Sequence, residues 1–116
     1  MTYSIKSSHG ASGHVIAVGG EADANAEREL EDAFREAVRA TLEVGGERVI
    51  VIDLGGATFV DSRILGILVR WSEDLRDKDW KVPLVCDDER LLRLFAMTGV
   101  ARSLDIHPTL ASAQAV

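Results

Sequence analysis

The sequence predicts a single α/β domain with a mixed, mainly parallel β-sheet covered by helices, and three observations lead to this fold class. The chain has 116 residues, which suits one domain with one hydrophobic core. Strand-like and amphipathic helical segments alternate along most of the chain, and this alternation requires βα crossovers and hence parallel strands. The first two strand-like segments are joined by a short turn, so they add an antiparallel hairpin. We treat residues 1–116 as one domain.

The first half of the chain supplies the hairpin, a helix and a buried strand. Residues 3–7 and 14–18 are predicted strands, and the segment between them consists of turn-forming residues. Apolar side chains then recur at helical spacing over residues 30–42 among charged ones, which predicts an amphipathic helix. Residues 48–54 form an unbroken, largely β-branched run, typical of a strand buried on both faces. We therefore expect this strand at the centre of the sheet.

The second half continues the alternation. A helix is predicted from Asp61-Ser62 to Leu75, and residues 82–86 form the next strand. A third helix over residues 91–97 ends before Gly99. Leu104 to His107 is expected to add a short edge strand, and Thr109 is expected to cap a last short helix.

Composition and charge exclude several classes of partner. The formal net charge is −6, which disfavours capture of nucleic acid or of an anionic membrane, since both require clustered lysine and arginine. The single cysteine, Cys86, cannot close an internal disulfide, so a reducing compartment is expected. No apolar run is long enough to span a bilayer and the start of the chain lacks a signal sequence. We expect a soluble, cytoplasmic protein that is not inserted in a membrane.

The residues that carry catalysis or bind metals are sparse. The three histidines lie in predicted turns or strand ends with no metal-ligand spacing. The pairs Gly19-Gly20, Gly45-Gly46 and Gly55-Gly56 lack the spacing of a nucleotide-binding loop and are interpreted as turns. Asp53 and Asp61 have no partner acid or nucleophile beside them in the sequence. We expect no metal, no cofactor and no enzymatic activity, and therefore a protein that acts by binding a partner.

The hydroxyl of Ser62 lies at a position where functional residues are expected. In open α/β sheets, functional residues collect where strands end and helices begin, and both Asp23 and Asp61-Ser62 follow predicted strands. Ser62 lies at a helix N-terminus, beside unpaired backbone N–H groups and the positive end of the helix dipole. Two interpretations remain open on local evidence, an ordinary N-cap and a phosphorylation site.

Four short motifs in a fixed order connect the chain to a known family. They are Gly20-Glu21-Ala22-Asp23, Val49-Ile50-Val51-Ile52-Asp53-Leu54, Phe59-Val60-Asp61-Ser62 and Leu94-Phe95-Ala96-Met97-Thr98-Gly99-Val100. Together they resemble the STAS domain of anti-sigma factor antagonists, and the resemblance runs from about His14 to the C-terminus.

The resemblance implies a bacterial partner-switching regulator of transcription. In that family, the serine after the aspartate at the start of the second helix is phosphorylated by an anti-sigma factor that is itself a serine kinase. Ser62 is the matching residue here. The unphosphorylated protein would bind the kinase and release a sigma factor, and phosphorylation would break the complex. A phosphatase would be a second partner.

The chain departs from the family pattern immediately after Ser62. The usual Asp-Ser-Ser-Gly-Leu-Gly is replaced by a segment in which Arg63 adds charge and Ile64 adds bulk, which changes the surface offered to a partner. For Phe59, burial in the core and exposure on the partner surface both remain open. The predicted partner surface comprises Asp23, Thr58, Phe59, Asp61, Ser62, Arg63 and Ile64.

Two alternatives of other classes are kept. In the first, the chain is a STAS subunit of a larger lipid-transport or stress-signalling complex, its contact is constitutive and Ser62 is only a cap. In the second, it binds a small molecule or nucleotide at the same strand ends. Trp71 is predicted to pack in the core, because it shares a helical face with Ile64, with a place on the partner surface as the alternative.

Overall fold

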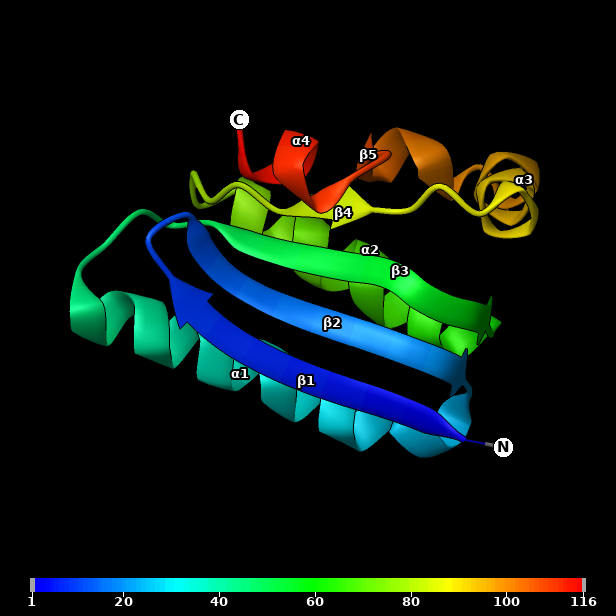
Figure 1. The fold of residues 1–116 in the computed structure, drawn as a ribbon, viewed down its shortest axis with the longest axis horizontal. Helices are drawn as coiled ribbons and strands as arrows, with labels where there is room; N and C mark the ends of the chain where they lie inside the picture. Colours follow the sequence, from blue (N-terminus) through cyan, green and yellow to red (C-terminus); the bar gives the residue numbers. More distant parts are fainter. Residues whose placement is uncertain (1, 116) are drawn as a thin grey trace.

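The computed structural model describes residues 2–115 as a five-stranded sheet with helices packed against it (Figure 1). In chain order the elements are β1 (Tyr3–Gly10), β2 (Gly13–Ala22), the 3-10 helix η1 (Ala24–Ala26), α1 (Glu27–Val44), β3 (Ile50–Val60), α2 (Ser62–Arg76), β4 (Pro83–Val85), α3 (Glu89–Thr98), the 3-10 helix η2 (Val100–Ser103), β5 (Asp105–His107) and α4 (Leu110–Gln114). The predicted α/β class is confirmed.

The sheet is mixed and mainly parallel, as predicted. Its strands follow the order β1-β2-β3-β4-β5. β1 and β2 form an antiparallel hairpin in which Tyr3 lies opposite Gly20 and Gly10 opposite Gly13. Every other neighbouring pair is parallel, because each of these connections carries a helix that crosses one face of the sheet. β3 therefore lies at the centre, where its β-branched run is buried.

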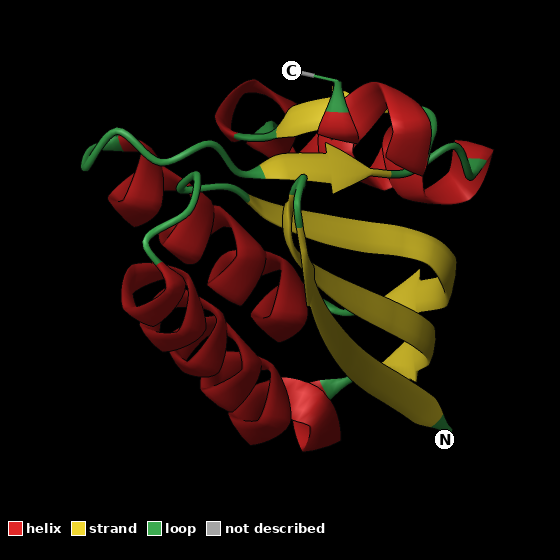
Figure 2. Cartoon of the chain, turned by 60° about the vertical axis from the view of Figure 1, so that its left-hand side comes forward, coloured by secondary structure: helices red, strands yellow, loops and turns green. Residues whose placement is uncertain are grey.

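The two faces of β3 pack against different layers. Ile50 and Ile52 belong to the main hydrophobic cluster, which includes residues of α1 and α2. Figure 2 shows these two helices side by side against one face of the sheet. Val51 points to the opposite face and belongs to a smaller cluster with Ala113 of α4. Burial on both faces explains why this strand has no alternating polar residues at its start.

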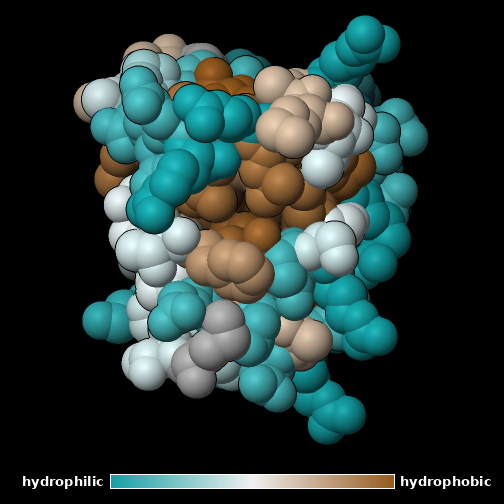
Figure 3. All heavy atoms as spheres, turned by 90° about the vertical axis from the view of Figure 1, so that its right-hand side faces the viewer, coloured by the Kyte–Doolittle hydropathy of each residue, from teal (hydrophilic) through white to brown (hydrophobic). Residues whose placement is uncertain are grey.

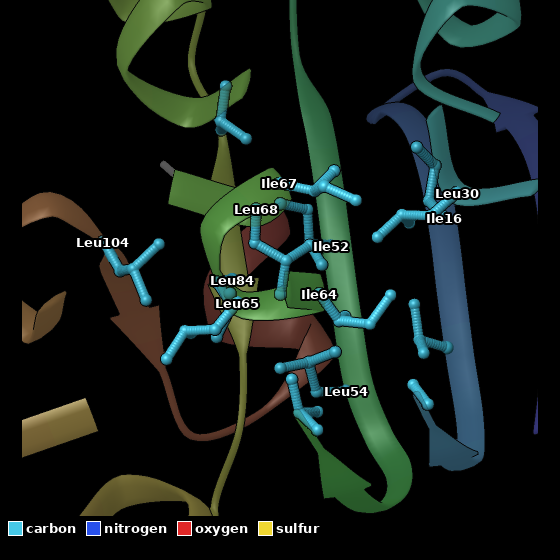
Figure 4. Packing of buried hydrophobic residues seen from close by; sticks show 14 of the residues in the cluster. Ile16, Leu30, Ile52, Leu54, Ile64, Leu65, Ile67, Leu68, Leu84 and Leu104 are labelled. Carbon is cyan, nitrogen blue, oxygen red and sulfur yellow. The ribbon is translucent and has the colours of Figure 1, made fainter. Parts of the chain in front are cut away.

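The main cluster fixes the position of α2. Figure 4 shows Ile52 and Leu54 of β3 close to Ile64 and Leu68 of α2, and all four side chains are almost fully buried. Burying a side chain of this size contributes roughly 1.5–3 kcal/mol. Because apolar residues on one face of α2 point into this cluster, the opposite face and the N-terminus of the helix remain at the surface.

Two of the glycine pairs that we predicted to form turns lie within strands instead. Gly19 and Gly20 belong to β2, Gly55 and Gly56 belong to β3, and Gly19 pairs with Gly56. The register shifts just before Gly19 and just after Gly20, and Gly20 has a φ of 72° that favours glycine. These glycines therefore lie in an irregular stretch of the pairing between β2 and β3. Gly45, with a φ of 77°, ends α1 as predicted.

Side-chain caps and glycine define the ends of the later helices. Asp88 caps α3, and the backbone N–H of Leu91 is the main cause of the lowered pKa of its carboxyl group. Gly99 ends this helix in the left-handed conformation, as predicted. Thr109 caps α4 in a reciprocal capping box with Ser112, which confirms its predicted role.

Candidate functional site

The ends of β2 and β3 bring the predicted site residues together. Ala22 lies opposite Val60 in the parallel register, and the backbone N–H of Asp61 donates to the carbonyl oxygen of Ala22 at 3.1 Å. Asp23 and Asp61 directly follow these paired residues, so both lie at the same carboxyl edge of the sheet. The structure thus joins two segments that are far apart in the sequence.

Asp61, and not Ser62, is the N-cap of α2. Its carboxylate Oδ1 accepts a hydrogen bond from the backbone N–H of Ile64 at 3.0 Å. Ser62 is the first residue of the helix and is exposed, and within residues 2–115 its hydroxyl has no hydrogen-bond partner. The interpretation of Ser62 as the cap is therefore wrong. Aspartate and serine are both good caps, so the sequence alone did not decide between them.

A second cap places the start of α1 beside the start of α2. Asp23 is the N-cap of η1, and its Oδ1 accepts from the backbone N–H of Asn25 at 3.0 Å. η1 leads directly into α1, whose first residue, Glu27, forms an ion pair with Arg63 at 3.4 Å between Oε2 and Nη1. Both side chains are exposed. Arg63 is thus tethered across the two helix N-termini.

Six of the seven residues predicted for the partner surface are at least partly exposed, and one is buried. The side chains of Thr58, Ser62 and Arg63 are exposed, and those of Asp23 and Asp61 are partly exposed. Phe59 is 41% exposed near the end of β3, so of the two alternatives left open for it, burial in the core is wrong.

Ile64 does not belong to that surface. Its side chain is 0% exposed and packs in the main cluster, so the expectation that it adds bulk at the partner surface is wrong. The physical reason is helical periodicity: Ile64 lies four residues before Leu68 and therefore shares its buried face.

An apolar hollow occupies the end of the molecule at which β2 and β3 finish. Figure 3 views this end and shows hydrophobic side chains gathered in a hollow with polar side chains around it. Phe59 and Met97, from β3 and α3, are exposed large hydrophobic residues, Met97 by 79%. An exposed apolar patch with a polar border is typical of a protein-interaction surface.

Met97 was not predicted as a site residue, although the sequence contains a signal for it. It lies two residues after Phe95, which is buried, so it falls on the opposite side of α3. A large apolar residue on the polar side of an amphipathic helix indicates a binding surface. The partner of Arg63, Glu27, had no such signal, because the pair joins residues 36 positions apart.

The remaining histidines and aspartates singled out in the sequence lie apart from the candidate site or are already hydrogen-bonded. Nδ1 of His9 lies 3.2 Å from Nδ1 of His14, at the start of β2 and away from the strand ends. Asp53 accepts from the backbone N–H of Gly55 at 2.8 Å, and Asp61 is occupied as a cap, so they do not act as a carboxylate pair. In this part of the chain, no group of three or more histidine, cysteine or acidic side chains is arranged to hold a metal ion.

Cys86 is buried at the end of β4, and burial raises the pKa of its thiol. A buried thiol with a raised pKa is a poor nucleophile. Among the described helices, none combines the length and apolar character that crossing a membrane requires.

Comparison with known proteins agrees with this architecture. A family model described as the STAS domain matches residues 5–113. The chain belongs to the STAS-domain family. None of the curated proteins compared with the chain matches it.

Solved structures resemble this STAS domain over nearly its whole length. The crystal structure of an anti-sigma factor antagonist from Mycobacterium paratuberculosis has a TM-score of 0.84 and 25% identity, covering 98% of this chain and 92% of that chain. The antagonist SpoIIAA in its unphosphorylated form has a TM-score of 0.64 and 14% identity, with coverages of 96% and 92%. The Bacillus cell fate determinant SpoIIAA in the phosphorylated form has a TM-score of 0.63 and 17% identity, with coverages of 97% and 96%. The two SpoIIAA structures share the fold of this STAS domain.

Within this STAS domain, the two departures from the family pattern have different consequences. Ile64 is buried, so its larger side chain is accommodated in the core and does not alter the surface. Arg63 is exposed and adds a positive charge next to Ser62. Of these two departures, only Arg63 therefore changes the surface that a partner could contact.

Proposed function

We propose that this STAS domain is an anti-sigma factor antagonist: it binds an anti-sigma factor with serine-kinase activity and thereby frees a sigma factor. Phosphorylation of Ser62 by that kinase ends the complex, and a phosphatase restores it. The observation that carries the proposal is the free, exposed hydroxyl of Ser62 at the start of α2, next to an aspartate that already caps the helix. The Mycobacterium paratuberculosis neighbour, an anti-sigma factor antagonist, supports the same role.

Phosphorylation of Ser62 is compatible with the folded domain. The phosphate adds a charge of about −1.5 to −2. The N-terminus of α2 and the guanidinium of Arg63 both favour that charge, whereas Asp61 and Glu27 oppose it. Solvent screening at this exposed helix end limits the repulsion. We therefore expect the fold to survive and the modification to act on the interface.

The same charge is costly inside a complex. A partner that covers the start of α2 removes water from the phosphate, and a desolvated charge reduces affinity unless a cation of the partner meets it. The proposed contact surface surrounds Ser62 with Asp23, Thr58, Phe59 and Arg63. Met97 of α3 is a further exposed large apolar side chain. In this proposal, apolar contacts provide the affinity for the partner, and phosphorylation of the Ser62 hydroxyl regulates binding.

The test combines modification with binding. We expect the cognate kinase and ATP to place one phosphate on Ser62, identified by peptide mass spectrometry. Binding to that kinase, measured by titration calorimetry with a non-hydrolysable ATP analogue, should be retained by Ser62→Ala and weakened at least about tenfold by Ser62→Asp. All variants should keep a native circular dichroism spectrum.

Ser8→Asp is the matched control. Ser8 is exposed on β1 and lies far from the carboxyl ends of β2 and β3, where Ser62 is found. It adds the same charge and should leave binding unchanged. If the kinase leaves Ser62 unmodified and Ser62→Asp binds as the wild type does, the switch is refuted. A constitutive subunit of a larger complex would then be the better description.

A further inference from the structure

β1 forms one edge of the sheet, and its outer side has no neighbouring strand. It is the first strand in the sheet order, and within residues 2–115 no further strand lies along its outer side (Figure 1). All eight of its residues pair with β2 in one continuous register without a bulge. The side chains of Ser4, Lys6 and Ser7 are exposed. A long edge strand without a bulge is a template for pairing with another strand.

The pairing of β1 with β2 determines which backbone groups of β1 face outward. Tyr3 lies opposite Gly20, so Thr2 lies opposite Glu21, and the backbone N–H of Glu21 donates to the carbonyl oxygen of Thr2 at 2.9 Å. Hydrogen-bonded and non-hydrogen-bonded pairs alternate along an antiparallel ladder. Every second residue from Thr2 onward therefore bonds to β2, and the residues between them direct their N–H and C=O groups outward. These outward-facing residues are Tyr3, Ile5, Ser7 and His9.

The two edges of the sheet differ in their protection against pairing. The opposite edge, β5, has three residues, begins with the charged Asp105 and is followed by Pro108, which has no backbone N–H. Short strands, charged side chains and proline are common protections of a sheet edge. From Tyr3 to Gly10, β1 contains no proline and no acidic residue, and Lys6 is its one lysine or arginine. The free hydrogen-bonding groups of β1 therefore favour pairing with an extended strand.

We propose that β1 pairs antiparallel with β1 of a second copy of the chain, which joins the two sheets edge to edge about a two-fold axis. Such an interface is isologous, so each contact occurs twice. The charge of Lys6 selects the register. An axis at Lys6 would place two lysines opposite each other, which is destabilising. An axis at Ile5 instead places Lys6 opposite Ser4 of the second copy.

The axis at Ile5 also satisfies the outward-facing backbone groups. Ile5 then forms a hydrogen-bonded pair with Ile5 of the second copy, and Tyr3 forms one with Ser7 of the second copy. The side chain of Ile5 already packs against the main cluster, so the contact between the two isoleucines extends this apolar layer across the axis. The strand is thus self-complementary in backbone groups, charge and apolar contact, and these three properties favour a second copy as the occupant.

The proposed dimer does not use the surface around Ser62. Ser62 starts α2 after the carboxyl end of β3, and β2 lies between β1 and β3 in the sheet. Dimerisation therefore goes beyond the proposed function and does not depend on it. Each dimer would carry two copies of the candidate site.

Sedimentation velocity of the purified chain at increasing concentration tests for the dimer. We expect the average mass to rise from 12.6 kDa toward twice that value. Ser7→Pro removes an outward-facing N–H and no hydrogen bond to β2, so the circular dichroism spectrum should stay native. The same variant should raise the dissociation constant of the dimer at least about tenfold, because its loss occurs twice across the axis. A wild type that stays monomeric up to high micromolar concentration would refute the proposal.

Two opposite charges at Ser4 test the register. Ser4→Lys places a lysine opposite Lys6 of the second copy and should raise the dissociation constant about fivefold, whereas Ser4→Glu should lower it about fivefold. Ala111→Lys is the matched control, because Ala111 is exposed on α4 and the variant adds the same charge as Ser4→Lys. It should dimerise as the wild type does. Equal dissociation constants for Ser4→Lys and Ser4→Glu would overturn this pairing, even in a chain that dimerises through another surface.

Discussion

At the scale of single residues, the helix cap and the proposed phosphorylation site are different residues. Asp61 satisfies the backbone N–H of Ile64 and stabilises the start of α2, a contribution of about 1 kcal/mol for a typical cap. Ser62 is left without a hydrogen bond in the described part of the chain. Modification of Ser62 therefore removes no interaction from the free domain. We therefore expect the proposed phosphate on Ser62 to act on binding and not on the fold.

His14 gives the domain a predicted sensitivity to acid. Its ring is buried, its Nε2 has no hydrogen-bond partner among residues 2–115, and its Nδ1 lies 3.2 Å from Nδ1 of His9. Burial is the main cause that lowers the pKa of His14 below 6.5, and the charge of His9 lowers it further, while Glu36 opposes the shift. The folded state therefore binds a proton less readily than the unfolded state.

The consequence for stability has a definite sign. The free energy of unfolding should be at its full value above the unfolded pKa of His14 and should decrease as the pH falls from about 6.5 toward 5. Urea titrations at a series of pH values measure this slope. His14→Gln should flatten it, whereas His107→Gln serves as the control, at a partly buried histidine that pairs with the exposed Asp105. A slope that is equal in the wild type and His14→Gln would contradict the assignment.

At the scale of elements, α2 contributes one face to the hydrophobic core and its other face to the candidate site. One face, including Leu65 and Leu68, is buried in the main cluster, and the other presents Ser62 and Gly66 to solvent. Its partner helix α1 is joined to it through Glu31, which accepts from the guanidinium of Arg70 and from the indole N–H of Trp71. The orientation of the site therefore depends on the packing of α1 against α2.

Trp71 should be a stability residue rather than a binding residue. Its ring stacks on Phe34 of α1 with centroids 5.1 Å apart and an interplanar angle of 5°, and its Nε1 lies 3.1 Å from Glu31. Trp71→Ala should lower the free energy of unfolding by about 3 kcal/mol, measured by urea denaturation. Trp71→Phe keeps the stack and should cost only about 1 kcal/mol for the lost hydrogen bond. A stable Trp71→Ala variant that lost only partner binding would place this residue on the interface instead.

At the scale of the whole molecule, the main hydrophobic cluster supports the end of the sheet at which the candidate site lies. The main cluster draws residues from strands β2, β3 and β4 and from helices α1, α2 and α3. The candidate site lies where β2 and β3 finish, and the histidine pair lies at the start of β2, at the other end of that strand. Changes at the histidines should therefore affect stability without acting directly on the contact surface.

The domain should fold on its core alone. Within residues 2–115, no group of three or more potential ligands is placed to hold a metal ion. Adding a strong chelator should leave the thermal unfolding midpoint unchanged, because no metal-binding free energy is lost. Differential scanning calorimetry with and without chelator measures this directly. A large downward shift of the midpoint would reveal a metal site.

Local patterns determined most of the fold. The β-branched run that became β3 and the 3.6-residue periodicity of α1 and α2 identified the elements, since each pattern reports which faces need burial. The main error of the sequence-based prediction was to assign turns to two glycine pairs that lie in strands. Gly55 and Gly56 have a strong local preference for turns, but pairing of β3 with β2 holds them in the strand.

The sequence by itself determined the α/β class, the place of Asp61-Ser62 at a helix entrance and the family resemblance, because these depend on periodicity and on short motifs. Only the tertiary structure decided which residue caps the helix and which neighbours of Ser62 are exposed. Ile64 is buried and Gly66 is bare because packing of α2 on the sheet fixes the rotation of the helix. The contact between Arg63 and Glu27 forms only because the ends of β2 and β3 place the starts of α1 and α2 side by side. No local sequence pattern encodes that arrangement.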